Sequence, residues 1–442
     1  HAETVNALEE LGVDVHAQDQ QQRTALHLAA LRGSARTVKV LVELGVDVHA
    51  QDTNGDTALY FASGYGRTET VKTLVQWEAE TRTTDDNGEA AIDLVELLEH
   101  MEMNILQDLG SSKSLQQELT NQHLATHSRY AETVKVLVES GANVHAQNAF
   151  GYTALHAAAC FAHTAMVRML VELGAGVRAY NNSKCTALHF AAEKGHTEMV
   201  GLLVELGAEV CALENDGGTA LQRAAGNGHD QTVKLLVDLG ADVHVQNEVG
   251  HTALHIAACN GHTETTKMLV ECEADICARD KCGDTALCMA ARRGHAETVA
   301  ALVEQGADVC ALDGEGRTAL YSAIVCNHTE TATALVELGA DVHEKDVHGD
   351  ALIHVAARQG NAEMVNVLVD MGVDVCVQDN RGCSALHWVA SMGSLEIVKI
   401  MVDQGADMCA QDSKGRTALH KASCWGHKET VKALVELGAD AH

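Results

Sequence analysis

The chain has 442 residues, enough for two or three ordinary domains or for one long solenoid without a central core. Hydrophobic residues make up 46% of the chain but aromatic residues only 3%, which favours thin layers of Ala-, Val- and Leu-filled helices over a large globular core. A formal charge of −31 disfavours nucleic acid and anionic membranes as general partners, and no run of about 18 apolar residues predicts a membrane span.

The fourteen cysteines all lie between Cys160 and Cys424, without the tight spacing of a disulfide-stapled domain. This distribution favours a reducing compartment, so we expect an intracellular, cytoplasmic protein. Any targeting segment is expected to lie beyond His1 or His442, because the chain opens without Met and inside a repeated pattern.

In chain order, His1 to Ala17 come first and resemble the second helix and finger of a repeat whose first helix is missing. At the other end, Ala441-His442 stops inside a finger, and neither end has the polar capping repeat that usually closes a solenoid. We therefore expect a segment of a longer protein, or ends that an adjoining subunit covers.

A Thr-Ala-Leu-His string, or a close variant, recurs along the whole chain. Successive copies are 33 residues apart except for one step of 30 residues, between Ala90 and Thr120. Such regularity predicts a repeat protein. The copies begin at Thr24, Thr57, Ala90, Thr120, Thr153, Thr186, Thr219, Thr252, Thr285, Thr318, Ala351, Ser384 and Thr417.

Each copy predicts two short helices and a finger, as the repeat that begins at Thr252 illustrates. Thr252 is a suitable N-cap for a first helix with a small-residue face, which Gly261 ends. Glu264 lies in the first turn of a second helix, and an extended finger with a turn at Gly283 leads to the next repeat. Neither helix is long enough to be stable alone, so stacking on neighbours must stabilise both.

The pattern resembles the ankyrin repeat in its Thr-x-Leu-His-x-Ala-Ala string, its Gly261-His262 pair and its Gly339-Ala340-Asp341-Val342 finger. The resemblance implies an all-α solenoid, a curved stack of helix-turn-helix units with β-hairpin fingers. It covers nearly the whole chain, as repeats in 1–89, a degenerate repeat in 90–119, and repeats again in 120–442. One departure is uniform, because Ala replaces the family's Pro and the chain contains no Pro at all.

The repeat predicted at 90–119 lacks a finger and is three residues short. The repeat after it has a poor first helix at Thr120-Asn121-Gln122-His123 and recovers at Glu132-Thr133-Val134-Lys135. A decayed repeat is the simpler interpretation, and a specialised hinge or partner site is the alternative. In either case, local unfolding is expected to begin there.

Histidine and cysteine provide the candidate chemistry. Of the 26 histidines, 22 fall at three repeat positions, typified by His255, His262 and His244, and a recurring position indicates a recurring structural role. We expect the first to bond near the Thr cap and the second to pack at the inter-helix turn. The third position alternates His and Cys, but neighbouring repeats about 10 Å apart offer only pairs of ligands, so buried or half-buried structural Cys is preferred to a metal site.

By resemblance to the family, a partner binds the finger tips and the ends of the first helices, which line a concave face. From Lys281 onward that surface carries eight cations against three acids, Asp284, Glu315 and Asp350, which reverses the sign of the whole molecule. Nearer the N-terminus it carries a sparse aromatic stretch. The candidate residues are Lys281, Arg292, Arg293, Arg317, Arg358, Arg381, Lys414 and Arg416, with Met392 and Trp425, and Tyr65, Phe150, Tyr152 and Phe161.

We therefore predict a scaffold that binds a protein partner, with an acidic segment on the basic surface; ordinary solvated Arg is the alternative for that surface. No enzyme activity, cofactor or metal is expected, because no repeat combines a nucleophile, a base and an orienting group and no Gly-rich phosphate loop occurs. The alternative function is the partner-recruiting arm of a larger enzyme, such as a kinase or ubiquitin ligase, or the cytosolic arm of a membrane channel.

Overall fold

The computed structural model describes residues 14–77, 97–98, 130–346 and 349–439. The chain forms two compact units, a first unit of His1–Asn215 and a second unit of Asp216–His442. Apart from residues 97–98, the predicted degenerate repeat at 90–119 lies outside the described residues, as do the two chain ends.

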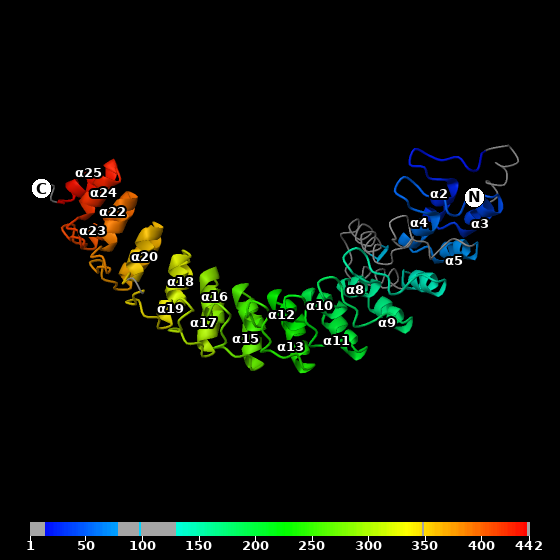
Figure 1. Ribbon diagram of the computed structural model, residues 1–442, viewed down its shortest axis with the longest axis horizontal. Helices are drawn as coiled ribbons and strands as arrows, with labels where there is room; N and C mark the ends of the chain where they lie inside the picture. The colour runs from blue at the N-terminus through cyan, green and yellow to red at the C-terminus, as the bar shows by residue number, and fades with distance from the viewer. Residues whose placement is uncertain (1–13, 78–96, 99–129, 347–348, 440–442) are drawn as a thin grey trace, which may run out of the picture. The chain divides into compact units, whose positions relative to one another are not determined.

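In both units, short helices follow one another in pairs, the first helix of each pair beginning directly after the predicted Thr cap (Figure 1). The first unit contains α2 (Ala25–Arg32), α3 (Ala35–Glu43), α4 (Ala58–Gly64), α5 (Thr68–Gln76), the helical residues 130–139, α8 (Ala154–Cys160), α9 (Thr164–Glu172), α10 (Ala187–Glu193) and α11 (Thr197–Glu205).

The second unit repeats the same pairing. It contains α12 (Ala220–Gly226), α13 (Asp230–Asp238), α14 (Ala253–Cys259), α15 (Thr263–Glu271), α16 (Ala286–Arg293), α17 (Ala296–Glu304), α18 (Ala319–Val325), α19 (Thr329–Glu337), α20 (Leu352–Gln359), α21 (Ala362–Asp370), α22 (Ala385–Met392), α23 (Leu395–Asp403), α24 (Ala418–Cys424) and α25 (Lys428–Glu436).

Like helices stack on like helices. In the second unit α14 packs on α12 and α16, and α15 packs on α13 and α17. Leu254, Ala257 and Ala258 of α14 are fully buried, because small side chains let the first helices approach closely. The core is therefore a continuous layer shared between repeats, as expected for helices of seven to nine residues that cannot be stable alone.

The first predicted histidine position ties each repeat to the following one. The Nδ1 of His255 accepts a hydrogen bond from the backbone N–H of Thr252 at 3.2 Å, which caps α14 as predicted. The other ring nitrogen, Nε2, then carries the proton and donates it to the backbone oxygen of Asp284 in the next finger, also at 3.2 Å. Burial lowers the pKa of His255 and so favours this neutral form.

The second histidine position ties each repeat to the preceding one. His262 lies in the turn between α14 and α15, as predicted, and its Nε2 lies 3.0 Å from the backbone oxygen of Gly226. His295 makes the equivalent contact with Cys259 at 3.0 Å, and His328 with Arg292 at 3.1 Å. Where both positions are His, as in the repeat of α14 and α15, the two rings bond to the neighbours on either side; Gln222, Cys288 and Tyr321 replace the first histidine in other repeats.

The all-helical repeat fold is confirmed, with one difference in the fingers. They consist of tight turns, closed for example by the Asp280 N–H donating to the Asp284 oxygen at 2.9 Å. Within the described residues the only β-structure is three isolated bridges, between Gln51 and Thr57, Lys345 and Ala351, and Gln378 and Ser384. The extended finger strands that the sequence predicted are therefore too short to form a ladder, because side-chain-capped turns already satisfy their backbone groups.

None of the described helices is both long enough and apolar enough to cross a lipid bilayer.

Candidate functional site

The predicted basic surface follows from two recurrent positions in the second unit. Arg293, Met392 and Trp425 each lie eight residues after an N-cap, at the end of a first helix. Arg381 and Lys414 each lie three residues before an N-cap, in the turn of a finger. Because the repeats stack in register, equivalent positions face the same way, and these side chains share one face of the unit.

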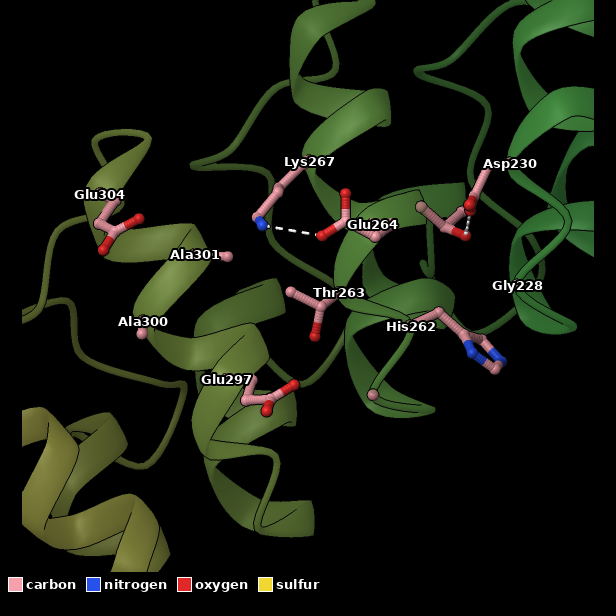
Figure 2. Close-up of a pocket in the computed structure, with 12 residues that line it drawn as sticks. Gly228, Asp230, His262, Thr263, Glu264, Lys267, Glu297, Ala300, Ala301 and Glu304 are labelled. Atoms are coloured by element: carbon pink, nitrogen blue, oxygen red, sulfur yellow. Dashed lines mark hydrogen bonds and ion pairs between the residues drawn. The ribbon is translucent and has the colours of Figure 1, made fainter.

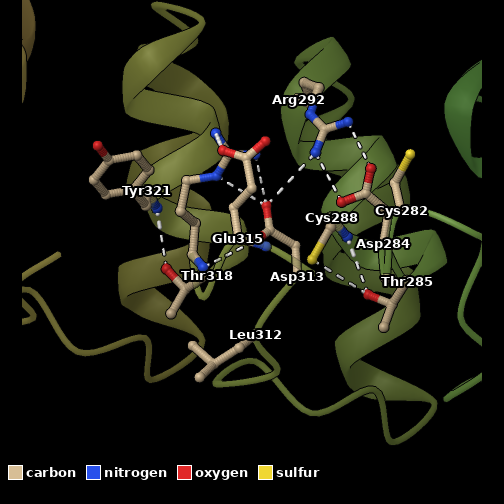
Figure 3. A network of polar contacts seen from close by, with 12 residues as sticks. Cys282, Asp284, Thr285, Cys288, Arg292, Leu312, Asp313, Glu315, Thr318 and Tyr321 are labelled. Carbon is tan, nitrogen blue, oxygen red and sulfur yellow. Dashed lines mark hydrogen bonds and ion pairs between the residues drawn. The ribbon is translucent and has the colours of Figure 1, made fainter. Parts of the chain in front are cut away.

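Arg292 belongs to this face but is held by acidic groups. Its guanidinium makes a bidentate contact with the buried carboxylate of Asp284, at 2.6 and 2.8 Å, and lies 3.8 Å from Asp313 of the next finger (Figure 3). The hydrogen bonds with Asp284 raise the pKa of Arg292. This arginine therefore joins two fingers rather than standing free for a partner.

Arg317 is held in the same way. The Asp313 carboxylate accepts the backbone N–H groups of Glu315 and Arg317, both at 2.9 Å, and lies 3.0 Å from the Arg317 guanidinium. The exposed carboxylate of Glu315 adds a second contact at 2.6 Å. The buried Asp313 thus shapes the finger and neutralises the cation beside it.

Arg416 and Lys421 share one buried acid, Asp412, at 2.7 and 3.1 Å. Burial alone would raise the pKa of Asp412, but hydrogen bonds from Arg416, from the backbone and from Lys421 outweigh it and hold the pKa well below its usual range. Arg358 likewise pairs with the buried Asp350.

The predicted balance of eight cations against three acids is therefore wrong as a count of surface charge. Asp284 and Asp350 are 4% and 5% exposed, so they are buried ligands for Arg292 and Arg358 rather than surface acids. This pairing could not be predicted from the sequence, because each Arg is eight residues from its Asp and the contact requires the helix to lie against the finger.

Four of the predicted cations remain available for contact with a partner. Lys281, Arg293, Arg381 and Lys414 are exposed, and within the described part of the chain their side chains form no ion pair. Met392 and Trp425 are 47% and 69% exposed on the same face. Four cations and two large apolar side chains thus remain as the candidate contact surface.

Trp388 belongs to this region but was not predicted. The Arg358 guanidinium lies over its indole ring, 5.2 Å from the centroid, and also pairs with Asp350. The indole is half-buried, at the centre of α22, and its Nε1 has no hydrogen-bond partner among the described residues. The available signal was an aromatic residue at a helix position where Phe61 and Phe190 stand in other repeats.

One group of aromatic residues in the first unit lies in two adjacent repeats. Tyr152 lies 5.2 Å from Phe190 and 6.0 Å from His156, measured between ring centroids. Phe150 is 69% exposed at the finger tip, while Phe161 is half-buried at the end of α8. Tyr65 is half-buried after α4, in an earlier repeat. Phe190 is the member that sequence reasoning missed.

The cysteines at the third recurrent position are more exposed than predicted. Cys277, Cys310, Cys376 and Cys409 are all exposed. Cys288 is buried, and burial raises the pKa of its thiol. No group of three or more His, Cys, Asp or Glu suited to a metal ion occurs among the described residues.

A furrow of about 620 Å³ lies on the other helix row of the second unit, along α13, α15 and α17 (Figure 2). The charged residues of its lining are mostly acidic, namely Asp230, Glu264, Glu297 and Glu304, and Lys267 forms an ion pair with Glu264 at 2.9 Å. None of the predicted partner-binding residues lines it. Its charge and its open form favour a solvated outer surface.

Comparison with known proteins agrees with this architecture. A family model described as ankyrin repeats (3 copies) matches residues 1–85, 122–214, 207–280, 277–346 and 353–442. Among solved structures, the ankyrin repeat domain of Bcl-3, described as a unique member of the IkappaB protein family, is 29% identical. The match covers 50% of this chain and 99% of that one, with a TM-score of 0.46. No curated protein matches the chain significantly.

Proposed function

The chain belongs to the ankyrin-repeat family, whose repeats generally serve as protein-binding modules, and we propose that it binds an acidic segment of a partner protein. The proposed contact surface is the face of the second unit that carries Lys281, Arg293, Arg381 and Lys414. Ankyrin-repeat domains are typically non-enzymatic, and we propose the same for this chain.

The observation that carries the proposal is the contrast between paired and unpaired cations. Buried aspartates hold Arg292, Arg317, Arg358 and Arg416, so the fingers and helix ends are fixed in place before a partner arrives. The unpaired cations lie on that fixed surface of a chain whose formal charge is −31. A local patch of opposite sign attracts acidic segments and disfavours other partners.

Met392 and Trp425 supply the apolar part of the same surface. Arg and Trp are the residues that most often carry interface energy, and both occur here at equivalent helix ends. We therefore propose a partner segment in which acidic side chains alternate with apolar ones.

A second candidate surface is the aromatic group of the first unit, Phe150, Tyr152, Phe161 and Phe190. Exposed aromatic rings contribute large contact areas at low entropic cost. Its exposed member Phe150 makes it a site for an apolar or aromatic partner segment, separate from the acidic one.

The larger context of the chain is also a proposal. The same surface would serve a free scaffold, the recruiting arm of a kinase or ubiquitin ligase, or the cytosolic arm of a channel. We propose an intracellular location, because exposed thiols such as Cys277 and Cys310 persist in a reducing environment.

Charge reversal tests the acidic-partner proposal. One variant changes Lys281, Arg293, Arg381 and Lys414 to Glu, and a matched control changes four lysines of the second helices, Lys234, Lys399, Lys428 and Lys432, to Glu. Partners recovered with the parent chain by affinity purification are measured against all three proteins at physiological salt. We expect at least about tenfold weaker binding for the first variant only. Equal binding by both variants, or equal loss, contradicts the proposal.

A further inference from the structure

The second helices of successive repeats are joined by one recurring set of contacts. In the second unit, the Oγ1 atoms of Thr263 in α15 and Thr298 in α17 lie 2.8 Å apart, and the two residues are separated by 35 positions. Beside them lies Lys267, whose hydrogen bond with Glu264 is the main reason that its pKa is raised (Figure 2). The negative charges of Glu304 and Glu297 in α17 raise the pKa of Lys267 further. This arrangement identifies two second helices that are immediate neighbours.

The same contacts occur in the first unit, between helices much farther apart in sequence. The Oγ1 atoms of Thr68 in α5 and Thr133 in the helical residues 130–139 also lie 2.8 Å apart, but 65 positions separate the two residues. The hydrogen bond with Glu69 is the main reason that the pKa of Lys72 in α5 is raised, and the charge of Glu132 raises it further.

The alignment of the two helix pairs is residue for residue. Thr68 and Lys72 take the places of Thr263 and Lys267. The string Ala-Glu-Thr-Val at 131–134 is identical to the string at 296–299. The helical residues 130–139 therefore occupy the position of the next second helix after α5.

Residues 97–98 supply the matching first helix. Leu97 and Leu98 are helical and 0% and 1% exposed. A methyl carbon of Leu97 lies 3.9 Å from the point where Gly64, the last residue of α4, would carry a Cβ atom. A first helix therefore packs beside α4 in the same step of the stack in which residues 130–139 pack beside α5.

We propose that the interval predicted to hold a degenerate repeat at 90–119 and the first part of another repeat forms one repeat with an insertion. The separation of 65 instead of 35 positions leaves a surplus of 30 residues. The surplus lies between Leu98 and Tyr130, where the repeat of α14 and α15 has only the turn 260–262.

This register also sharpens the aromatic surface, a consequence that rests on the proposed function. Tyr65 and Phe161 occupy equivalent positions after α4 and α8. If one repeat rather than two lies between the repeats of Tyr65 and Phe161, the two residues are two repeat steps apart. At the usual helix spacing that distance is about 20 Å rather than about 30 Å.

Two deletions of 30 residues each, made in the full chain, test the inference. The first removes 99–128 and changes Arg129 to Gly, because the equivalent residue Gly261 has a left-handed backbone with φ of 74°. The second removes 90–119 and with it Leu97 and Leu98. We expect the first to keep its melting temperature within about 4 °C of the parent and the second to lose more than that. Equal effects, or the reverse order, overturn the inference.

A double-mutant cycle tests the same register without any deletion. Thr68→Val and Thr133→Val are combined and compared with the matched pair Thr263→Val and Thr298→Val. We expect both pairs to show the same non-additive shift of the denaturation midpoint. Additive effects at Thr68 and Thr133 beside coupling at the matched pair overturn the inference. Neither experiment uses a partner, so failure of the proposed binding function leaves both results interpretable.

Discussion

Acid is expected to loosen the second unit through the histidines that join its repeats. His255, His354 and His387 are at most 1% exposed, and burial lowers the pKa of each below the ordinary value of 6.5. In each case Nδ1 accepts the backbone N–H of the N-cap residue while Nε2 donates to a carbonyl of the next finger. A second proton on the ring would oppose the first of these contacts.

The sign and size of the effect follow from proton linkage. Below pH 6.5 the unfolded chain binds protons that the folded histidines refuse, so stability falls as pH falls through that range. At pH 5.5 the loss approaches about 1.4 kcal/mol for each histidine that stays neutral when folded, or about 4 kcal/mol for the three. Asp412, whose pKa is held low, stays ionised in both states across this range and contributes no slope.

One repeat already carries Gln in place of the capping His, which suggests a control variant. Gln222 stands at the same position as His255 and bonds in the same way, accepting the Thr219 N–H at 3.2 Å and donating to the His251 oxygen at 2.9 Å. The triple variant His255→Gln, His354→Gln, His387→Gln therefore keeps the bridges and removes the titration. Glu344, whose pKa burial raises, titrates in the opposite direction but is common to both proteins and cancels in the comparison.

The assay is urea denaturation followed by far-UV circular dichroism at pH 7.5 and pH 5.5. We expect the parent midpoint to be lower at pH 5.5 than at pH 7.5 and the triple variant to show a smaller decrease. His27 and His156, whose pKa burial also lowers, are common to both proteins and keep the rest of the pH dependence. A parent midpoint that is equal at both pH values contradicts the reasoning, as does a variant that keeps the full pH dependence.

Three further predictions concern stability and thiol reactivity. Gly261→Ala is expected to destabilise the fold by at least about 1 kcal/mol more than Gly306→Ala in denaturant titrations, because both backbones are left-handed but only the first would place Cβ 2.5 Å from a neighbouring histidine ring. Asp412→Asn is expected to lower the melting temperature more at pH 7 than at pH 2, because the contribution of this low-pKa carboxylate declines progressively as the pH falls below the ordinary value of 3.8. Iodoacetamide is expected to modify Cys277 in the native chain and to spare Cys288, as mass spectrometry of the digests would show.

The repeat, its helices and the role of its histidines could be predicted from the sequence because each depends on local order. Thr252 caps α14 and His255 bonds back to it within four residues, so the spacing alone carries the information. The contact between His255 and Asp284 joins residues 29 positions apart. Because equivalent contacts recur at the same separation in other repeats, the contact can be inferred from the repeat pattern.

The electrostatic detail could not be predicted, because it depends on how a helix end lies against a finger. Arg292 and Asp284 are eight positions apart, and nothing in that spacing shows that their side chains meet. The register near Ala90 was hidden for a different reason. A Thr-Asn-Gln-His string at 120–123 resembles the start of a repeat, whereas the contacts of Thr68 with Thr133 and of Leu97 near Gly64 indicate which helices are neighbours.

The charged residues of the second unit serve either the fold or the proposed binding surface, depending on whether they lie in a buried ion pair. Acids at finger positions such as Asp313 and Asp412 are buried, accept backbone N–H groups and hold one or two cations each, so they shape the fingers whatever the partner. Arg293 and Arg381 make no such contact among the described residues, and replacing them costs the fold little. Binding specificity can therefore change at the unpaired positions while the stack stays intact, and the charge-reversal variant should lose its partner without losing its melting temperature.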